Sequence, residues 1–279
     1  MYVNKGGKVK NLLKEGIVVM PGAFNAITAK IIEACGFKAV YVSGAGLANG
    51  MAGYPDTGLL AMREVLDQAR YIANAVDIPV IADMDTGFGG PENTARAVKE
   101  FEMARIAGIH IEDQEFPKKC GHLPGKRLIP PQEMSLKIKS AARARTSPDF
   151  LIIARTDARG VKGMKDAIKR ASIYLDAGAD AIFPEGLETK TEFMSFAKKI
   201  KAPLLANMTE FGKTPYITVN EFENMGYKIV ICPLTGFRIM LKSVMDAMIE
   251  LKKSGTQKNL LDKMFTRKEL YKLLKYEGY

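Results

Sequence analysis

The sequence predicts a (β/α)₈ barrel, and three observations support that fold class. Eight short apolar runs rich in β-branched residues alternate with eight helix-like stretches, which is the repeat of a barrel of parallel strands. The chain of 279 residues suits one barrel, which needs roughly 250. Links from helix to strand are brief and contain glycine, whereas several links from strand to helix are long and polar. A doubly wound sheet shares the alternation and is the main alternative.

The predicted strands are nearly continuous apolar runs, as expected of parallel strands that are buried on both faces. They span residues 17–20, 39–43, 80–83, 108–112, 150–155, 179–184, 203–207 and 228–232. The predicted helices span residues 26–35, 62–76, 92–107, 132–144, 164–177, 190–200, 219–225 and 237–253. We expect one domain over residues 1–279, with 255–279 as a C-terminal helical extension that packs on the same or another subunit.

The composition argues against a membrane, secreted or nucleic-acid-binding protein. No run reaches the roughly 20 apolar residues of a membrane helix, and the lysine-rich start lacks the apolar segment of a secretory signal. The net charge is +10, but the lysines are scattered and no aromatic residues alternate with them, which predicts solvated surface or a field that attracts an anionic substrate. The three cysteines show no paired spacing and fit a reducing compartment. We therefore expect a cytoplasmic protein. Cys35 and Cys232 have apolar neighbours in the sequence, and we expect them to lie in the core.

The long links follow the second, fourth and seventh predicted strands, at residues 43–61, 113–131 and 209–218. Long segments without regular structure in a compact domain are usually functional. In a barrel the carboxyl ends of all the strands meet at one rim, where such enzymes build their sites. The asymmetry of the links therefore predicts a site at that rim.

Two carboxylates, Asp83 and Asp85, follow the third predicted strand and precede a glycine-rich turn. On an extended backbone, residues two apart point to the same side, so these acids would repel each other unless a cation lay between them. Oxygen ligands suit a hard divalent cation such as Mg²⁺. Glu112, at the end of the next strand, would support the metal from behind. The alternative interpretations are a turn with two helix-capping acids and, for Glu112, a surface turn.

The loop after the fourth strand contains Lys118-Lys119-Cys120-Gly121-His122. A cysteine flanked by lysines and a histidine should lie in a positive field, which favours the thiolate and tunes proton transfer. An exposed cysteine or a fragment of a zinc site are the alternatives. Zinc usually needs four ligands, and the chain has two histidines. The other histidine, His110, lies in an apolar strand and is interpreted as a core residue.

Polar residues also follow the remaining strands. Arginines at that rim would grip a polycarboxylate through paired hydrogen bonds, although each residue taken singly could be a helix cap or a surface group. The glycine-rich run from Ser43 through Gly44 and Ala45 does not have dinucleotide-binding spacing; it is either a flexible turn or a loop whose amides bind an anion. The other strand-end candidates are Arg155, Glu185, Asn207, Met208, Thr209 and Arg238.

Taken in order, these motifs resemble the isocitrate lyase and phosphoenolpyruvate mutase superfamily, and within it the methylisocitrate lyases. The resemblance spans nearly the whole chain and rests on Ser43-Gly44, Asp83-x-Asp85-Thr86-Gly87-Phe88-Gly89, Glu112-Asp113-Gln114, the Lys118–His122 loop, Asn207-Met208-Thr209-Glu210-Phe211-Gly212 and Thr266-Arg267-x-Glu269-Leu270-Tyr271. The cysteine loop is specific to the lyase side of the superfamily.

The resemblance implies a Mg²⁺ enzyme, with Mn²⁺ as a substitute, that cleaves 2-methylisocitrate to pyruvate and succinate in the methylcitrate cycle of propionate catabolism. It also implies a homotetramer, a dimer of dimers whose last barrel helix is exchanged between subunits. Asp83 and Asp85 would hold the metal, with Glu112 behind. The implied substrate contacts are Ser43, Gly44, Ala45, Asp85, Cys120, Gly121, Arg155, Glu185, Asn207, Met208, Thr209, Arg238 and Arg267.

The expected mechanism is a retro-aldol cleavage. A base removes the proton of the substrate hydroxyl, and Cys120 returns a proton to the carbanion. Tyr41 is the first candidate for the base and Glu112 the second, while Lys118 and His122 act from the loop. The rivals are a lyase or decarboxylase for isocitrate, 2,3-dimethylmalate or oxaloacetate and, from another class, a non-catalytic barrel that binds acids or nucleic acid.

Overall fold

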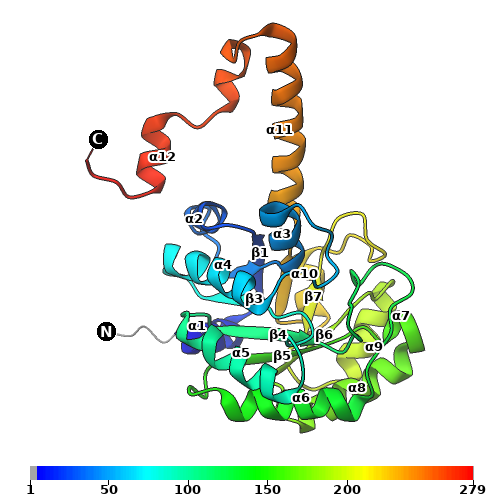
Figure 1. Cartoon of the computed structure of the whole chain (residues 1–279). Helices are drawn as coiled ribbons and strands as arrows, with labels where there is room; N and C mark the ends of the chain where they lie inside the picture. Colours follow the sequence, from blue (N-terminus) through cyan, green and yellow to red (C-terminus); the bar gives the residue numbers. More distant parts are fainter. Residues whose placement is uncertain (1–4, 279) are drawn as a thin grey trace.

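The computed structural model describes residues 5–278 and shows eight parallel strands ringed by helices (Figure 1). The strands pair in the order β6-β5-β4-β3-β2-β1-β8-β7, and a bridge between Ile182 and Leu204 links β6 to the start of β7. Because β1 pairs with both β2 and β8, the sheet is a nearly closed barrel, and the doubly wound alternative is wrong. The strands are β1 (Val18–Ala23), β2 (Val40–Val42), β3 (Val80–Asp83), β4 (Gly108–Glu112), β5 (Leu151–Thr156), β6 (Ala181–Pro184), β7 (Leu205–Asn207) and β8 (Ile229–Cys232).

The helices include all eight that the sequence predicts, with ends shifted by a few residues. They are α1 (Lys5–Glu15), α2 (Ala26–Ala34), α3 (Gly44–Leu47), the π-helical turn η1 (Ala48–Ala52), α4 (Met62–Ala75), α5 (Pro91–Met103), α6 (Pro131–Ala144), α7 (Arg159–Lys162), α8 (Met164–Asp176), α9 (Lys190–Lys199), α10 (Val219–Asn224), α11 (Thr235–Ser254), the 3₁₀ helix η2 (Lys258–Lys263) and α12 (Arg267–Leu273). The four additional segments α1, α3, η1 and α7 were not predicted. The loop after β2 is therefore partly helical, because the Ser43 hydroxyl accepts a hydrogen bond from the amide of Gly46 and caps α3.

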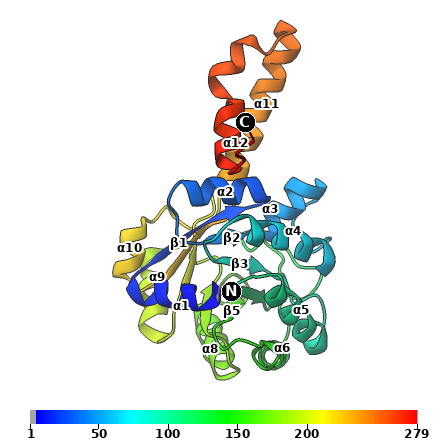
Figure 2. The same cartoon turned by 90° about the vertical axis from the view of Figure 1, so that its left-hand side faces the viewer.

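The core has two layers, because successive residues of each strand point to opposite faces. One layer lies between the strands and the surrounding helices. The other fills the inside of the barrel and includes Met20, Ile81, Ile153 and Phe183. Helix α1 adds Val9 and Leu13 to this inner layer and lies across the barrel end where the strands begin (Figure 2). The amino end of the barrel is thus filled, and the polar residues gather at the carboxyl end.

Helix α11 leaves the barrel and projects away from it, and the chain then returns through η2 to α12 (Figures 1 and 2). Helix α11 contacts β1 of the barrel, and α12 contacts α2. The projecting arm, residues 239–276, leaves many large apolar side chains exposed: Ile239, Leu241, Val244, Met245, Met248, Ile249, Leu251, Leu261, Met264, Phe265, Leu270, Leu274 and Tyr276. The arm therefore presents an apolar surface that this chain does not cover.

The structure also bears on two sequence expectations, that no helix spans a membrane and that Cys35 and Cys232 are core residues. In the part of the chain that the structure describes, no helix combines the length and the apolar character needed to cross a membrane. The expectation that Cys35 lies in the core is wrong: it caps the C-terminus of α2 and is exposed. Cys232 is half-buried at the end of β8.

Candidate active site at the barrel mouth

Asp83 and Asp85 lie at the end of β3, but the extended geometry expected for them is wrong. The strand stops at Asp83, and Asp85 has a left-handed φ of 47°. The amide of Asp85 donates to the Asp83 carboxylate at 2.9 Å, so a local turn brings the two acids together. Its carbonyl accepts from the amide of Glu112 at 2.9 Å, which ties the turn to β4.

The two acids differ in their partners. Burial opposes ionisation of Asp83, but the neighbouring charge of His110 outweighs it and holds the pKa of Asp83 well below its usual range. For Asp85, burial raises the pKa despite Lys118, whose ammonium lies 2.6 Å from Asp85 Oδ1. Lys118 also pairs with Asp56. Burial lowers the pKa of Lys118, but the charges of Asp85 and Glu112 outweigh this and raise it well above its ordinary value.

Glu112 is fully buried at the end of β4, and neither of its carboxylate oxygens has a hydrogen-bond partner among the described residues. Arg155 Nη1 lies 3.4 Å from Glu112 Oε2. Burial raises the pKa of Glu112 well above its usual value. A buried carboxylate without hydrogen bonds is costly unless it is protonated or near a cation.

These oxygens fit a hard divalent cation. The acids at the ends of β3 and β4 supply oxygen donors, which Mg²⁺ prefers, and Glu112 has both oxygens free of hydrogen bonds. Within residues 5–278, no three His, Cys, Asp or Glu side chains form a ready-made cage. Mg²⁺ commonly keeps several waters and needs only one or two protein carboxylates, so this arrangement suits it.

Tyr41 and His110 both contact Asp83. The Tyr41 hydroxyl is 2.7 Å from His110 Nε2 and 3.3 Å from Asp83 Oδ2, and the two rings stack with their centroids 5.7 Å apart. Burial raises the pKa of Tyr41 well above its usual value, and Asp83 adds to this. His110 is therefore the buried core histidine that the sequence suggested, and its contact with Tyr41 also makes it part of the polar site.

The cysteine loop is folded over the mouth. The peptide of Gly121 lies so close to β5 and β6 that a Cβ there would come within 2.4 Å of Glu185 Cγ and 2.5 Å of Arg155 Nη2. Burial raises the pKa of the Cys120 thiol. The expectation that positive neighbours favour the thiolate is therefore wrong, because burial and the charges of Asp56 and Glu185 outweigh the stabilising contacts.

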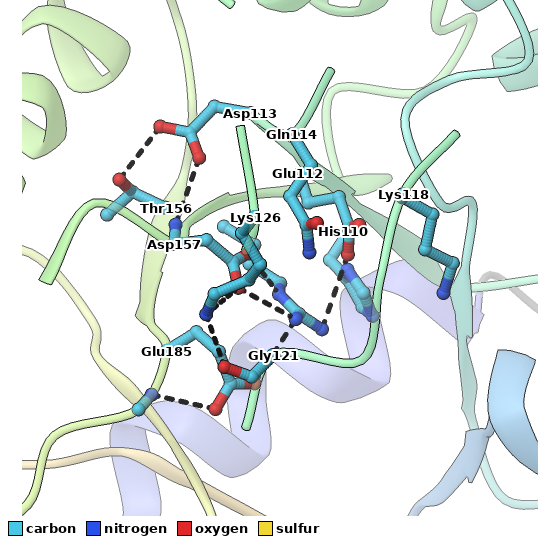
Figure 3. Close-up of polar contacts among 12 residues, drawn as sticks. His110, Glu112, Asp113, Gln114, Lys118, Gly121, Lys126, Thr156, Asp157 and Glu185 are labelled. Carbon is cyan, nitrogen blue, oxygen red and sulfur yellow. Dashed lines mark hydrogen bonds and ion pairs between the residues drawn. The ribbon is translucent and has the colours of Figure 1, made fainter. Parts of the chain in front are cut away.

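An ion-pair network underlies the loop (Figure 3). Arg155 lies between three carboxylates, with Nε 2.9 Å from Asp157, Nη1 near Glu112 and Nη2 3.5 Å from Glu185. Glu185 also lies 3.1 Å from His122 Nε2 and accepts a hydrogen bond from the Asn207 side chain at 3.1 Å. Burial opposes it, but Arg155 and His122 hold the pKa of Glu185 well below its usual value.

The remaining predicted residues lie at different distances from this centre. Ser43 is buried, and a Cβ on Gly44 would lie 2.7 Å from Asp83 Oδ2, so the segment from Ser43 to Ala45 borders the acids. Met208 and Thr209 continue from β7. Arg238, in the first turn of α11, pairs with Glu210 at 3.5 Å and lies over the Phe211 ring.

Within this chain, Arg267 does not reach the mouth. It begins α12, whose neighbours are residues of α2 on the outside of the barrel. Neighbouring residues of the same segment, Phe265 and Glu269, line a pocket together with Glu33 of α2. The structure thus brings together the predicted residues of β2 to β7 and leaves Arg267 apart.

Sequence reasoning did not assign three polar residues to the site: His110, Asp56 and Lys126. A signal existed for His110, because it stands two residues before Glu112 on the same strand and therefore on the same face. Asp56 and Lys126 lie in the long segments that follow β2 and β4. Their pairing with Lys118 and Asp157 depends on how those segments fold back, which no local pattern shows.

Comparisons with known proteins agree with this geometry. The family model described as phosphoenolpyruvate phosphomutase matches residues 9–252. A 2-methylisocitrate lyase of Aeropyrum pernix is 53% identical over 95% of this chain and 85% of its own. A solved 2,3-dimethylmalate lyase, described as a PEP mutase/isocitrate lyase superfamily member, is similar with a TM-score of 0.94 and 33% identity over 98% of this chain and 92% of that one.

A solved phosphonopyruvate hydrolase in complex with oxalate and Mg²⁺ is similar with a TM-score of 0.88 and 30% identity, over 97% of this chain and 95% of that one. The family model and the relatives each cover most of the chain, and they include the barrel and its mouth. The chain therefore belongs to the phosphoenolpyruvate phosphomutase family, within the superfamily of PEP mutases and isocitrate lyases that its motifs indicated.

Proposed function

We propose that this protein is a Mg²⁺-dependent carbon–carbon lyase that cleaves 2-methylisocitrate to pyruvate and succinate. The observation that carries the proposal is the cysteine loop, which is closed over buried Arg155 and Glu185 and beside the acids of β3 and β4. The 53% identity to a 2-methylisocitrate lyase supports this substrate. The same reaction would place the protein in propionate catabolism through the methylcitrate cycle.

Asp83 and Asp85 would hold the cation, with Glu112 behind them. When bound, the cation supplies Lewis-acid polarisation and lowers the pKa of a substrate hydroxyl. The Mg²⁺ in the solved phosphonopyruvate hydrolase supports this choice, and Mn²⁺ shares its preference for oxygen ligands. The segment from Ser43 to Ala45 would bind the oxo-acid end of the substrate, because it borders Asp83.

The chain's own residues would then carry out a retro-aldol cleavage. A base takes the hydroxyl proton, the electrons of the O–H bond form the ketone of pyruvate, and the carbon–carbon bond breaks. Its electron pair stays on the carbon that becomes a methylene of succinate. Arg155 and Asn207 would offset the charge on that fragment. Cys120, held as a thiol by its raised pKa, would donate the proton that completes succinate.

The base is proposed to be Tyr41 or Glu112. Tyr41 touches Asp83, but its raised pKa makes the phenolate costly. The pKa of Glu112 is also raised, which brings a carboxyl group nearer to the value suited to proton transfer at neutral pH. His122 and Lys118 would act by holding the loop and the acids in place. The remaining contacts proposed for the substrate are Gly121, Glu185, Met208, Thr209, Arg238 and Arg267.

We also propose a cytoplasmic homotetramer, a dimer of dimers that exchange α11 and the segment after it. The exposed apolar side chains of the arm support this exchange. Exchange would carry Arg267 to the neighbouring subunit, which would explain why it does not reach the mouth of its own barrel. Residues 1–279 would form one barrel domain, with 255–279 as its helical extension.

The test is a product assay with 2-methylisocitrate, isocitrate, 2,3-dimethylmalate and oxaloacetate, each with and without EDTA. We expect the highest kcat/KM with 2-methylisocitrate, loss of activity with EDTA and recovery with Mg²⁺ or Mn²⁺. The Cys120→Ser variant should lose at least about 100-fold in kcat, whereas the control Cys35→Ser, at an exposed cysteine outside the barrel mouth, should not.

Preference for 2,3-dimethylmalate would instead assign the activity of the solved relative named for that acid. Absence of turnover with all four acids would contradict the lyase proposal and favour a barrel that only binds acids. Full activity in the presence of EDTA would contradict the proposed metal requirement.

A further inference from the structure

Lys126 lies in the segment that follows the cysteine and is almost completely buried. Its ammonium donates to Asp157 Oδ1 at 2.8 Å and to the carbonyl of Gly121 (Figure 3). A buried ammonium is costly unless it is paired and hydrogen-bonded, and here both partners are specific. One belongs to the cysteine loop and the other to the end of β5, so this side chain joins the loop to the barrel.

Asp157 is itself firmly held. Its carboxylate accepts from Arg155 Nε at 2.9 Å and from Nη2 at 3.2 Å, and its amide donates to buried Asp113 at 2.9 Å. The paired contact with Arg155 fixes the plane of the guanidinium as well as its position. Lys126 therefore bonds to a carboxylate that also orients the arginine at the centre of the site.

The loop doubles back to make this contact. The amide of Leu123 donates to the carbonyl of Cys120 at 2.9 Å, and Gly125 has a left-handed φ of 76°, which glycine adopts without strain. The reversal places the Lys126 ammonium against the Gly121 carbonyl. The loop is also tied at its start by paired hydrogen bonds between the Gln114 side chain and the backbone of Lys119, at 2.9 and 2.7 Å. The hydrogen bonds of the Lys126 ammonium anchor the loop on the C-terminal side of Cys120.

We propose that Lys126 is a positioning residue that holds the Cys120–Gly121 peptide over the site and, through Asp157, fixes the guanidinium of Arg155. It would act without contact with the substrate. Its effect on turnover rests on the lyase function proposed above, whereas its effect on access to Cys120 depends on the loop alone. Loss of the ammonium should free the loop without removing any group that touches the reacting atoms.

The experiment compares Lys126→Met with Arg127→Met in the full-length enzyme. Each variant removes one positive charge, from adjacent positions, but Arg127 is exposed and pairs with exposed Glu115. N-ethylmaleimide labelling of each cysteine is followed by peptide mass spectrometry, with exposed Cys35 as the internal reference. We expect Cys120 to be labelled at least about tenfold faster in Lys126→Met, because the open loop becomes more populated.

Steady-state kinetics with the best substrate provide a second readout. In Lys126→Met we expect kcat to fall by about 100-fold, because displacement of a reacting group by about 1 Å costs that much, while KM changes by less than about threefold because the groups that bind the ground state remain. The conservative Lys126→Arg should recover part of kcat. The Arg127→Met control should match the parent enzyme in both labelling and kcat.

Equal Cys120 labelling in Lys126→Met and Arg127→Met would overturn the proposal, as would an unchanged kcat. If Lys126→Met does not fold, Lys126→Gln is measured in its place, since it loses the charge but keeps an N–H donor group. If the parent enzyme cleaves none of the four acids, the lyase proposal fails, yet the labelling rates still decide whether Lys126 holds the loop.

Discussion

The titrating residues at the mouth fall into groups whose pKa values are driven in opposite directions. Those of Asp83 and Glu185 are lowered by neighbouring positive charge, whereas those of Glu112 and Cys120 are raised by burial. Sites that separate the pKa values of nearby groups in this way commonly divide acid and base roles between them. Here the ionised carboxylates lie beside His110, Arg155 and His122, and a protonated thiol lies above them.

At the barrel mouth, Gly121 is a tight residue-scale constraint, because a methyl group there would overlap Glu185 and Arg155. We expect Gly121→Ala to lower kcat/KM by about 100-fold through a displaced loop, with a change of less than about 1 kcal/mol in the free energy of unfolding because the loop can move outward. The measurements are steady-state kinetics and urea unfolding.

The matched control for that variant is Gly236→Ala in α11, where an added Cβ would meet nothing closer than Thr28 Cγ2 at 3.8 Å. It should keep the parent activity. Normal kcat/KM in Gly121→Ala would show that the closed loop position is not needed for turnover.

At the scale of elements, buried Asp113 connects strand ends to a helix. It accepts from Thr156 Oγ1 at 2.8 Å and from the amide of Asp157 on the β5 side, and from Tyr174 at 2.7 Å and Arg170 at 3.1 Å on α8. The Asp113→Ala variant should cost about 3–5 kcal/mol, because it leaves the buried Arg170 charge without this partner. Urea unfolding followed by circular dichroism measures it.

Asp166 provides the control, because it pairs with the same Arg170 at 2.8 Å but is partly exposed. Its replacement by Ala should cost less than about 1 kcal/mol. Similar losses in the two variants would mean that the buried network does not stabilise the contact between α8 and the strand ends.

The strands and main helices could be predicted from the sequence because each has a periodic apolar pattern long enough to recognise. Helix α1 was missed, since only Val9 and Leu13 of its apolar residues enter the inner core. The π-helical turn and α3 lie in a run rich in glycine and alanine whose conformation depends on packing against neighbouring strands. The left-handed backbone conformation of Asp85 likewise could not be predicted from the alternation of apolar and polar residues.

The candidate site was predictable in its chemistry and less so in its arrangement. Acids, arginines and the cysteine loop could be placed at one rim because parallel strands end together. The protonation state of Cys120 could not be predicted from the sequence, because burial raises the pKa of its thiol. That burial arises only when the loop is closed. The ties made by Lys118 and Lys126 join segments far apart in the chain or folded back on themselves.

At the scale of the whole molecule, the exposed apolar side chains of α11 predict association. Fully burying an apolar side chain of this size is worth about 1.5–3 kcal/mol, so the double variant Met245→Glu/Ile249→Glu should shift the protein to a smaller species. Sedimentation velocity measures the change. The control Ser243→Glu, at an exposed position on another face of the same helix, should keep the parent state. An unchanged mass in the double variant would contradict packing of this surface against another subunit.

The position of α1 affects the route by which substrate and products can enter and leave the barrel. Side chains of the inner layer fill the barrel, and Val9 and Leu13 of α1 pack at the end opposite the acids. In the part of the chain that the structure describes, substrate and products are therefore expected to pass through the carboxyl end, under the cysteine loop. Each turnover then needs this loop closed by Lys126 for the chemistry and open for exchange, so a loop that stayed open and a loop that stayed shut would both slow the enzyme.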